Sequence, residues 1–191
     1  MVQRRLARLV RRSLDGDAEA FRALFRALHG PVAAYIARRV LDPLDAEDLT
    51  ARVFHRMLER LSDYDARRGH VRSWVLTMAR NAVIDHLRTD KRHLEVRDAE
   101  LVADASFDPN AALDRDEAAA QLRELLADVP AEVREMLAMR FGDGLRHREI
   151  AEVLGLSEAA VKQRFSRTLR ELREKARAVG LQDGKGVGYA L

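Results

Sequence analysis

Residues 148–167 read REIAEVLGLSEAAVKQRFSR, a pattern that predicts two short helices joined by a tight turn. The small side chain of Ala151 lets the second helix cross the first closely. Gly155 can adopt the positive φ that the turn needs, and Ser157 is placed to cap the second helix. The stretch is therefore typical of a helix-turn-helix, which presents one helix to the major groove of DNA.

The second helix of this pair has an apolar side and a basic side. Val161, Phe165 and Thr168 fall on one side when each residue is advanced by about 100°. Residues 157–177 hold 7 basic and 3 acidic side chains. A helical hairpin with a solvated basic face is the simpler alternative to DNA binding. The residues expected to contact base edges or DNA phosphates are Lys162, Gln163, Arg164, Ser166 and Arg167.

The composition of the 191-residue chain favours helices. Hydrophobic residues make up 47%, aromatic residues only 5%, and there are 4 prolines, which favours helices packed through Leu, Ala and Val over a β-rich fold. The chain has no cysteine, so disulfides and Cys-ligated zinc are excluded and a cytoplasmic location is expected. No apolar run approaches the roughly 18 residues that span a bilayer, so no direct membrane insertion is expected.

Charge and periodicity divide the chain into parts. Residues 1–94 hold 19 Lys and Arg against 12 Asp and Glu, residues 95–130 hold 3 against 10, and residues 131–191 hold 12 against 9. The two basic parts favour a polyanionic partner, and the acidic part lacks a sustained apolar period. We therefore predict an all-α protein made of two small helical domains, a flexible acidic linker and a flexible tail. Their expected ranges are 1–93 and 112–178 for the domains, 94–111 for the linker and 179–191 for the tail.

Helical periodicity also dominates the first half of the chain. A helix is predicted within residues 17–30, with an apolar face that includes Phe25. Gly30-Pro31 predicts its end. Another helix is expected to begin near Asp45 and to carry an apolar stripe that includes Leu58. In the long helix that follows, Trp74 is expected to lie in the core rather than on a DNA-facing surface.

Three long stretches carry a specific resemblance. The runs DAEDLTARVFHRMLERLSDYD (45–65) and RGHVRSWVLTMARNAVIDHLR (68–88) resemble region two of the extracytoplasmic-function (ECF) sigma factors. The run LADVPAEVREMLAMRFGDGLRHREIAEVLGLSEAAVKQRFSRTLRELREK (126–175) is similar to their region four. The resemblance implies a non-enzymatic subunit that binds RNA polymerase core and directs promoter-specific transcription initiation. It also implies an anti-sigma factor as a partner.

The resemblance implies a division of labour between the two domains. The helix at 45–61 would dock on the largest polymerase subunit, with Asp45, Glu47 and Asp48 as candidate contacts. The helix-turn-helix would read the minus-thirty-five element of promoter DNA as duplex. The helix at 74–87 and the loop after it would hold the minus-ten element as single strand, which needs a pocket or platform for an unstacked base with cations nearby. The candidate minus-ten residues are Asn81, Arg80, Arg88, Lys91 and Arg92.

The chain departs from the family pattern at two places. Thr50, Ala51 and Arg52 stand where the family usually has an apolar residue, a Gln and an acid. This change reverses a charge on the expected polymerase-docking helix, so the acidic residues before it would carry more of that contact. Ala160 replaces a frequent Thr of the recognition helix. The acidic residues near 45–48 have a second interpretation, as partners of the positive helix N-terminus.

Other classes of function are less consistent with the sequence. The main alternative is a stand-alone helix-turn-helix regulator that binds a duplex operator without polymerase. No Ser/His/Asp arrangement, Gly-rich phosphate loop or HExxH motif is visible, so no catalytic site is expected. His70, His86 and His93 are irregularly spaced, so neither a metal site nor a cofactor is expected.

Overall fold

The computed structural model describes residues 2–89 and 122–178, and every regular element in those ranges is a helix. This confirms the predicted all-α class. The proposed linker at 94–111 and tail at 179–191 lie outside the described residues. The first half contains α1 (Val2–Leu14), α2 (Ala18–Ala37), α3 (Pro43–Glu59), the 3-10 turn η1 (Leu61–Asp63) and α4 (Val71–Thr89). The second half contains α6 (Ala131–Leu137), the π-helical turn η2 (Ala138–Gly142), α7 (His147–Leu154) and α8 (Glu158–Ala178).

Local sequence signals set the beginnings of α2 and α3. The Asp17 carboxylate accepts a hydrogen bond from the Ala20 backbone N–H at 3.0 Å, which caps α2. Asp42 caps α3 in the same way, by accepting from the Leu44 N–H at 2.8 Å. Pro43 occupies the first turn of α3, where its missing N–H costs nothing. The helix that was expected to begin near Asp45 therefore starts at this proline.

The predicted break at Gly30-Pro31 is wrong, because α2 continues through both residues to Ala37. Proline inside a helix removes one backbone hydrogen bond and strains the preceding turn. Val32 and Ile36 continue the buried stripe that Leu24 and Leu28 begin, and all four side chains are at most 1% exposed. Burial of this continuous stripe offsets the cost of the proline.

The apolar faces predicted for α2 and α3 were too wide. Phe25 is 37% exposed and Leu58 is 53% exposed, so neither belongs to the buried core. Phe25 instead lies against the edge of the core, with its ring centroid 4.6 Å from that of Phe54 and 5.1 Å from that of His29. A 3.6-residue period specifies a broad arc, and only the centre of that arc faces the neighbouring helices.

The second half forms the predicted helix-turn-helix from α7 and α8. Gly155 has φ +67°, in the left-handed region that the turn requires. The Ser157 hydroxyl accepts a hydrogen bond from the Ala160 N–H at 3.1 Å. Ala151 is 4% exposed, which permits close approach of the two helices. All three sequence signals for the turn are therefore confirmed.

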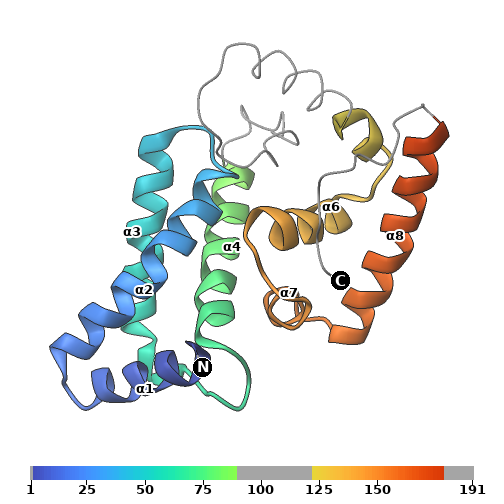
Figure 1. Ribbon diagram of the computed structural model, residues 1–191. Helices are drawn as coiled ribbons and strands as arrows, with labels where there is room; N and C mark the ends of the chain where they lie inside the picture. The colour runs from blue at the N-terminus through green and yellow to red at the C-terminus, as the bar shows by residue number, and fades with distance from the viewer. Residues whose placement is uncertain (1, 90–121, 179–191) are drawn as a thin grey trace, which may run out of the picture.

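The two halves pack against each other, with α4 lying beside α7 (Figure 1). Buried side chains from both halves form one continuous hydrophobic core. Ion pairs reinforce this packing. Asp143, which follows η2, has a side chain only 3% exposed and accepts a hydrogen bond from Arg39 at 2.9 Å. Arg38 lies 3.6 Å from the same carboxylate, and Arg72 donates to the Asp143 backbone carbonyl at 2.9 Å.

Candidate nucleic-acid interface

The recognition helix α8 has the two sides that its sequence predicts. Val161, Phe165 and Thr168 are buried, at 0%, 4% and 7% exposure. Among the predicted DNA contacts, Gln163 and Ser166 are exposed. Gln163, at this exposed position, is available to offer the paired donor and acceptor that suits an adenine edge in the major groove.

The basic side chains of α8 are held by acidic neighbours. Lys162 pairs with Glu158 at 2.7 Å, and Arg167 pairs with Glu171 at 2.9 Å. The Arg167 side chain remains 75% exposed, so DNA phosphates can reach it. Arg164 differs, because it reaches back to Glu132 of α6 at 2.5 Å and is only partly exposed.

A pocket of about 280 Å³ lies at the other candidate DNA surface, along the N-terminal part of α4. Its wall combines aromatic, amide and basic side chains. The Tyr64 and Trp74 rings lie 5.5 Å apart at a tilt of 55°. Asn81, exposed on α4, belongs to the lining. The charged side chains in the lining are of both signs: the basic ones are Arg56, Arg60, Arg68 and His70, and the acidic ones are Asp63, Asp65 and Glu152.

Trp74 lies at the edge of the core, where its ring also borders the pocket. Its side chain is partly buried and packs against the hydrophobic core. The same ring also lines the pocket. A partly exposed aromatic ring beside an amide and several cations is the chemical setting in which an unstacked base binds.

The other predicted minus-ten residues lie in different surroundings. Arg80 faces the second half and forms two hydrogen bonds with Glu135 of α6, at 2.8 and 2.9 Å. Arg88 is exposed near the end of α4 and lies 4.0 Å from Asp85. Lys91 and Arg92 lie outside the described residues.

The acidic residues of α3 are on the surface, as a docking role requires. Asp45, Glu47 and Asp48 are all exposed. Asp48 lies 3.8 Å from Arg52, with both side chains about two thirds exposed, at 68% and 67%. Asp45 lies 3.8 Å from His86 of α4. The acidic surface is therefore present, and the arginine that departs from the family pattern sits within it.

The Thr50 departure has a structural explanation. Its side chain is 6% exposed, so it occupies a buried position. The hydroxyl donates to the Ala46 carbonyl at 2.7 Å, which satisfies the buried polar atom. Ala51 and Arg52 are exposed and leave the packing of α3 unchanged.

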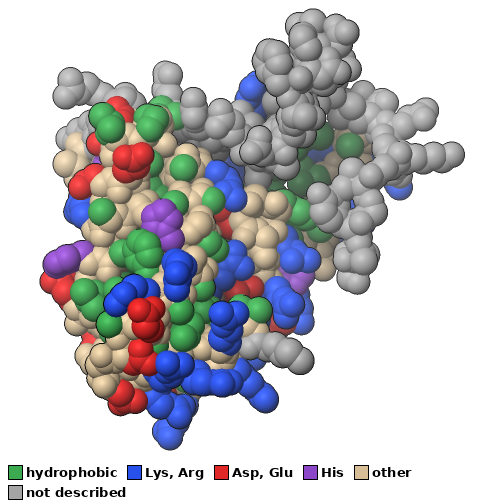
Figure 2. Space-filling view, turned by 60° about the vertical axis from the view of Figure 1, so that its left-hand side comes forward, with side chains coloured by type: hydrophobic (Ala, Val, Ile, Leu, Met, Phe, Trp, Pro, Cys, Tyr) green, Lys and Arg blue, Asp and Glu red, His purple; other side chains and the backbone are tan. Residues whose placement is uncertain are grey.

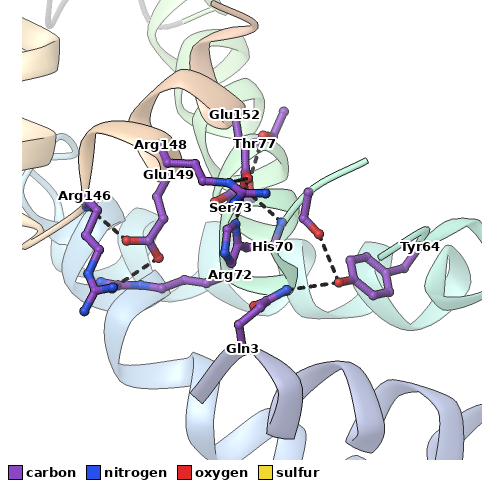
Figure 3. A network of polar contacts seen from close by, with 11 residues as sticks. Gln3, Tyr64, His70, Arg72, Ser73, Thr77, Arg146, Arg148, Glu149 and Glu152 are labelled. Carbon is purple, nitrogen blue, oxygen red and sulfur yellow. Dashed lines mark hydrogen bonds and ion pairs between the residues drawn. The ribbon is translucent and has the colours of Figure 1, made fainter. Parts of the chain in front are cut away.

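A polar network joins the start of α4 to α7 at the edge of the pocket (Figure 3). Glu152 of α7 accepts hydrogen bonds from the His70 backbone N–H at 2.9 Å and contacts the His70 ring Nδ1 at 2.7 Å. Burial opposes ionisation of Glu152, but the hydrogen bonds from His70 outweigh it and lower the carboxyl pKa. The start of α4 therefore holds an anion supplied by the second half.

Sequence reasoning missed the residues that complete this surface. Tyr64 and His70 lie in the connection between η1 and α4, whereas Glu152 lies on α7, and periodicity does not show which segments meet. Arg39 and Asp143 likewise pair across 104 positions of the chain. One usable signal was the run of basic residues before α4, because Arg67, Arg68 and His70 surround a glycine there.

Two other kinds of site were tested in the part of the chain that the structure describes. No group of three or more His, Asp or Glu side chains is arranged to hold a metal ion in residues 2–89 and 122–178. Within the same ranges, no helix is long and apolar enough to cross a membrane.

Comparisons with known proteins agree with this arrangement. The Sigma-70 region 2 family matches residues 24–93, and the Sigma-70, region 4 family matches residues 119–172. The ECF RNA polymerase sigma factor BldN of Streptomyces coelicolor is 31% identical over 170 residues, which cover 88% of this chain and 64% of BldN. The ECF RNA polymerase sigma factor SigF of Caulobacter vibrioides is 32% identical over 177 residues, covering 91% of this chain and 94% of SigF. The chain therefore spans just under two thirds of BldN and nearly all of SigF.

A solved structure supports the same assignment. CnrH in complex with the cytosolic domain of CnrY matches with a TM-score of 0.58 and 25% identity, over 89% of this chain and 96% of the matched chain. A helix-turn-helix with an exposed recognition helix defines a DNA-binding protein of all-α class. The chain belongs to the ECF RNA polymerase sigma factors, with a region 2 in its first half and a region 4 in its second.

Proposed function

We propose that this chain binds RNA polymerase core and directs promoter-specific transcription initiation by contacting promoter DNA at two points. The first half holds the minus-ten element as single strand, and α8 reads the minus-thirty-five element as duplex. Membership of the sigma family favours this function over a stand-alone regulator that binds an operator without polymerase. The single observation that carries the two-point proposal is the pocket beside Trp74 and Asn81, which a duplex-only regulator does not need.

The pocket has the chemistry that an unstacked base requires. Its volume of about 280 Å³ suits one nucleobase, and Trp74 and Tyr64 offer aromatic surface for stacking. The Asn81 amide supplies a donor and an acceptor for a base edge. Arg56 and Arg68 place cations around the same opening, where phosphates of the strand would lie, while Arg60 lies 3.9 Å from Asp63, one of three acids in the lining.

The recognition helix supplies the second contact. Gln163 and Arg167 are exposed on the same side of α8. Arg167 already holds a carboxylate, Glu171, in an exposed bond that DNA can replace. An exposed ion pair of this kind contributes little to stability, so exchange for a phosphate costs little.

Docking on polymerase is assigned to α3. Asp45, Glu47 and Asp48 form an exposed acidic surface on its first two turns. Leu44, in the same turns, is 76% exposed. An exposed apolar side chain within a charged rim is typical of a protein-binding surface. Arg52 reduces the negative charge there, so the three acids before it carry the electrostatic part of the contact.

An anti-sigma factor is the second protein partner in this proposal. The similar protein CnrH was solved with the cytosolic domain of CnrY bound. In this chain the exposed side chains Phe25 and Leu58 lie on α2 and α3, at 37% and 53% exposure. Figure 2 shows hydrophobic side chains interspersed with histidines on that face. A partner that covers this face would block polymerase docking on α3.

Separate substitutions of Asn81 and Arg167 by Ala test the two-point proposal. Asn81→Ala should lower transcription about tenfold from promoters with an intact minus-ten element and should relax base preference at that element alone, since one good base contact contributes about 1–3 kcal/mol. Arg167→Ala should weaken duplex binding at the minus-thirty-five element alone. Start-site mapping on promoters mutated in each element separates the effects. If either variant proved equally sensitive to mutation of the minus-ten element and of the minus-thirty-five element, this result would contradict the assignment.

A further inference from the structure

The N-terminal helix α1 carries an unusual concentration of arginine. Residues 1–14 contain five arginines and no Asp or Glu. At about 100° per residue, Arg4, Arg5, Arg8, Arg11 and Arg12 fall within an arc of roughly 120°. They therefore form one continuous basic face, which we call the α1 arginine face.

Most arginines of this face have no acidic partner. Arg12 is bound by Asp17, at 2.9 Å from its Nε. Arg4, Arg5, Arg8 and Arg11 are different, because in residues 2–89 and 122–178 nothing accepts a hydrogen bond or forms an ion pair with them. Some exposed arginines of the described chain do have such partners, as Arg22 has with Glu19 at 3.1 Å, so what sets this face apart is that four unneutralised arginines gather on one short helix.

The arginines at the start of α1 are not stabilised by the dipole of their own helix. Cations near a helix N-terminus oppose its positive dipole and cost about 0.3–1 kcal/mol each. Arg4 and Arg5 lie in the first turns of α1 and bear that cost. Arg11 lies in the last turn, where the dipole favours it. Only Arg4 and Arg5 therefore oppose the helix dipole, and the face as a whole, five arginines with a single acidic partner, favours a ligand of negative charge.

The other side of α1 is already covered by protein. Leu6 and Val10 are 5% and 2% exposed, and they belong to the hydrophobic core. A helix that binds a membrane surface must insert its apolar side among the lipids. Here that side is occupied, so α1 is not built to insert, and a polyanion in aqueous solution fits better.

The first turn of α1 contacts Tyr64, a residue that lines the pocket described above. The Gln3 side-chain amide donates to the Tyr64 hydroxyl at 3.2 Å (Figure 3). Tyr64 lines the pocket and packs beside Trp74. In Figure 2, Lys and Arg side chains gather along the lower edge of the molecule, at the height where Figure 1 shows α1. Arg4, the first residue of the α1 arginine face, directly follows Gln3 in the chain, so the face begins at the turn of α1 that contacts Tyr64.

We propose that the α1 arginine face binds phosphates of promoter DNA next to the minus-ten element, as a third DNA contact. This inference rests on the proposed function, because it assumes that a strand enters the pocket. The contact recognises the sugar-phosphate backbone and adds affinity without sequence preference. Its strength therefore depends steeply on salt.

The test compares two triple variants of the full chain, each assembled with core polymerase. One changes Arg4, Arg8 and Arg11 to Gln, and the other changes the same three residues to Lys. Binding to a promoter fragment with a single-stranded minus-ten region is measured between 50 and 200 mM salt. Each lost single-strand phosphate contact lowers the slope of log K against log salt by about 0.7. The Gln variant should lose about 2 from that slope and bind on the order of tenfold more weakly at low salt. The Lys variant should keep most of the salt slope and most of the affinity at low salt.

Further measurements separate the possible failures. Core affinity of the Gln variant, measured with labelled chain, should equal that of the unchanged protein. Transcripts at saturating holoenzyme should start at the same position, since the face contributes no base reading. An unchanged salt slope would overturn the inference while leaving the two-point proposal intact. Loss of affinity for core polymerase in the Gln variant would assign the α1 arginine face to polymerase binding, and this result would also overturn the inference. Arginine-dependent retention on phosphatidylglycerol vesicles, with promoter affinity unchanged, would assign it to a membrane and would also overturn it.

Discussion

Arg80 of α4 and Glu135 of α6 form a bidentate ion pair between the two halves of the chain, with N–O distances of 2.8 and 2.9 Å. The hydrogen bonds to Glu135 raise the Arg80 pKa above its ordinary value. Arg80 is also one of the candidate minus-ten residues. Because Glu135 already holds the Arg80 guanidinium, we expect any binding of DNA at Arg80 to compete with the contact between α4 and α6.

Substitution of Glu135 by Gln separates these two roles of Arg80. Both side chains are about a quarter exposed, at 27% and 23%, so loss of the charge should lower the free energy of unfolding by about 1–2 kcal/mol. The same change should leave binding to single-stranded minus-ten DNA equal or stronger, because Arg80 is freed. Arg80→Gln should weaken both. Urea denaturation measures the stability of each variant, and a binding assay with single-stranded minus-ten DNA measures its affinity. Weaker DNA binding by Glu135→Gln than by the unchanged protein would contradict the expected competition.

Asp143 is the most deeply buried acid of the contact between the halves. Its side chain is 3% exposed and faces Arg38 and Arg39. Asp143→Asn should lower the free energy of unfolding by about 3 kcal/mol, because it leaves two partly buried cations without their counter-charge. Urea midpoints measure this effect. The control is Asp48→Asn, whose carboxylate is 68% exposed and should contribute less than about 1 kcal/mol. Equal effects would show that the contact is not formed in solution.

The contact between Glu152 and His70 makes the packing of the halves sensitive to acid. The Glu152 pKa lies below its ordinary value of 4.5, so this carboxylate binds protons less readily in the folded state. Such a group stabilises the fold fully above 4.5, and its contribution is lost as the pH falls through the lowered value. Stability measured below pH 4.5 should therefore fall less steeply for Glu152→Gln than for the unchanged protein. Parallel pH profiles for the two proteins would refute this assignment.

A glycine is needed at position 155 because of the backbone conformation of the turn, and not because a side chain would lack room. A Cβ added there would meet nothing within 4 Å, yet φ is +67°. Gly155→Ala should therefore lower the free energy of unfolding by about 1 kcal/mol through backbone strain alone. Gly30 provides the control. It lies inside α2 with no positive φ, so Gly30→Ala carries no left-handed strain; its gain in helix propensity, up to about 1 kcal/mol, is opposed by crowding of the new Cβ against Pro31, and the net loss of stability should be smaller than at Gly155. Thermal unfolding of both variants checks the contrast.

The parts of the fold that depend on neighbouring residues could be predicted from the sequence. Gly155 and Ser157 act within one turn of chain, and both behave as expected. The split between buried and exposed residues of α8 follows from periodicity and is also as expected. Pro31 was misjudged because a local rule was applied where packing of the residues around it decides the outcome.

The parts that depend on distant residues could not be predicted. Arg80 was expected to face DNA, and nothing in its own segment indicates Glu135, which lies 55 positions away. The pocket has the same origin, since Tyr64 and Glu152 reach it from different halves. Periodicity shows which side of a helix is buried, but the partner of each side depends on the tertiary arrangement.

Transcription with purified core polymerase tests the central claim most directly. The full chain is added to core that lacks any other sigma factor, and run-off transcripts are measured from promoters of its source genome. We expect transcripts with defined starts that require both the chain and the core, and that Asn81→Ala and Arg167→Ala each reduce. Tight binding of the chain alone to duplex operator DNA, with no transcript from any promoter when core is present, would contradict the account and favour a stand-alone regulator.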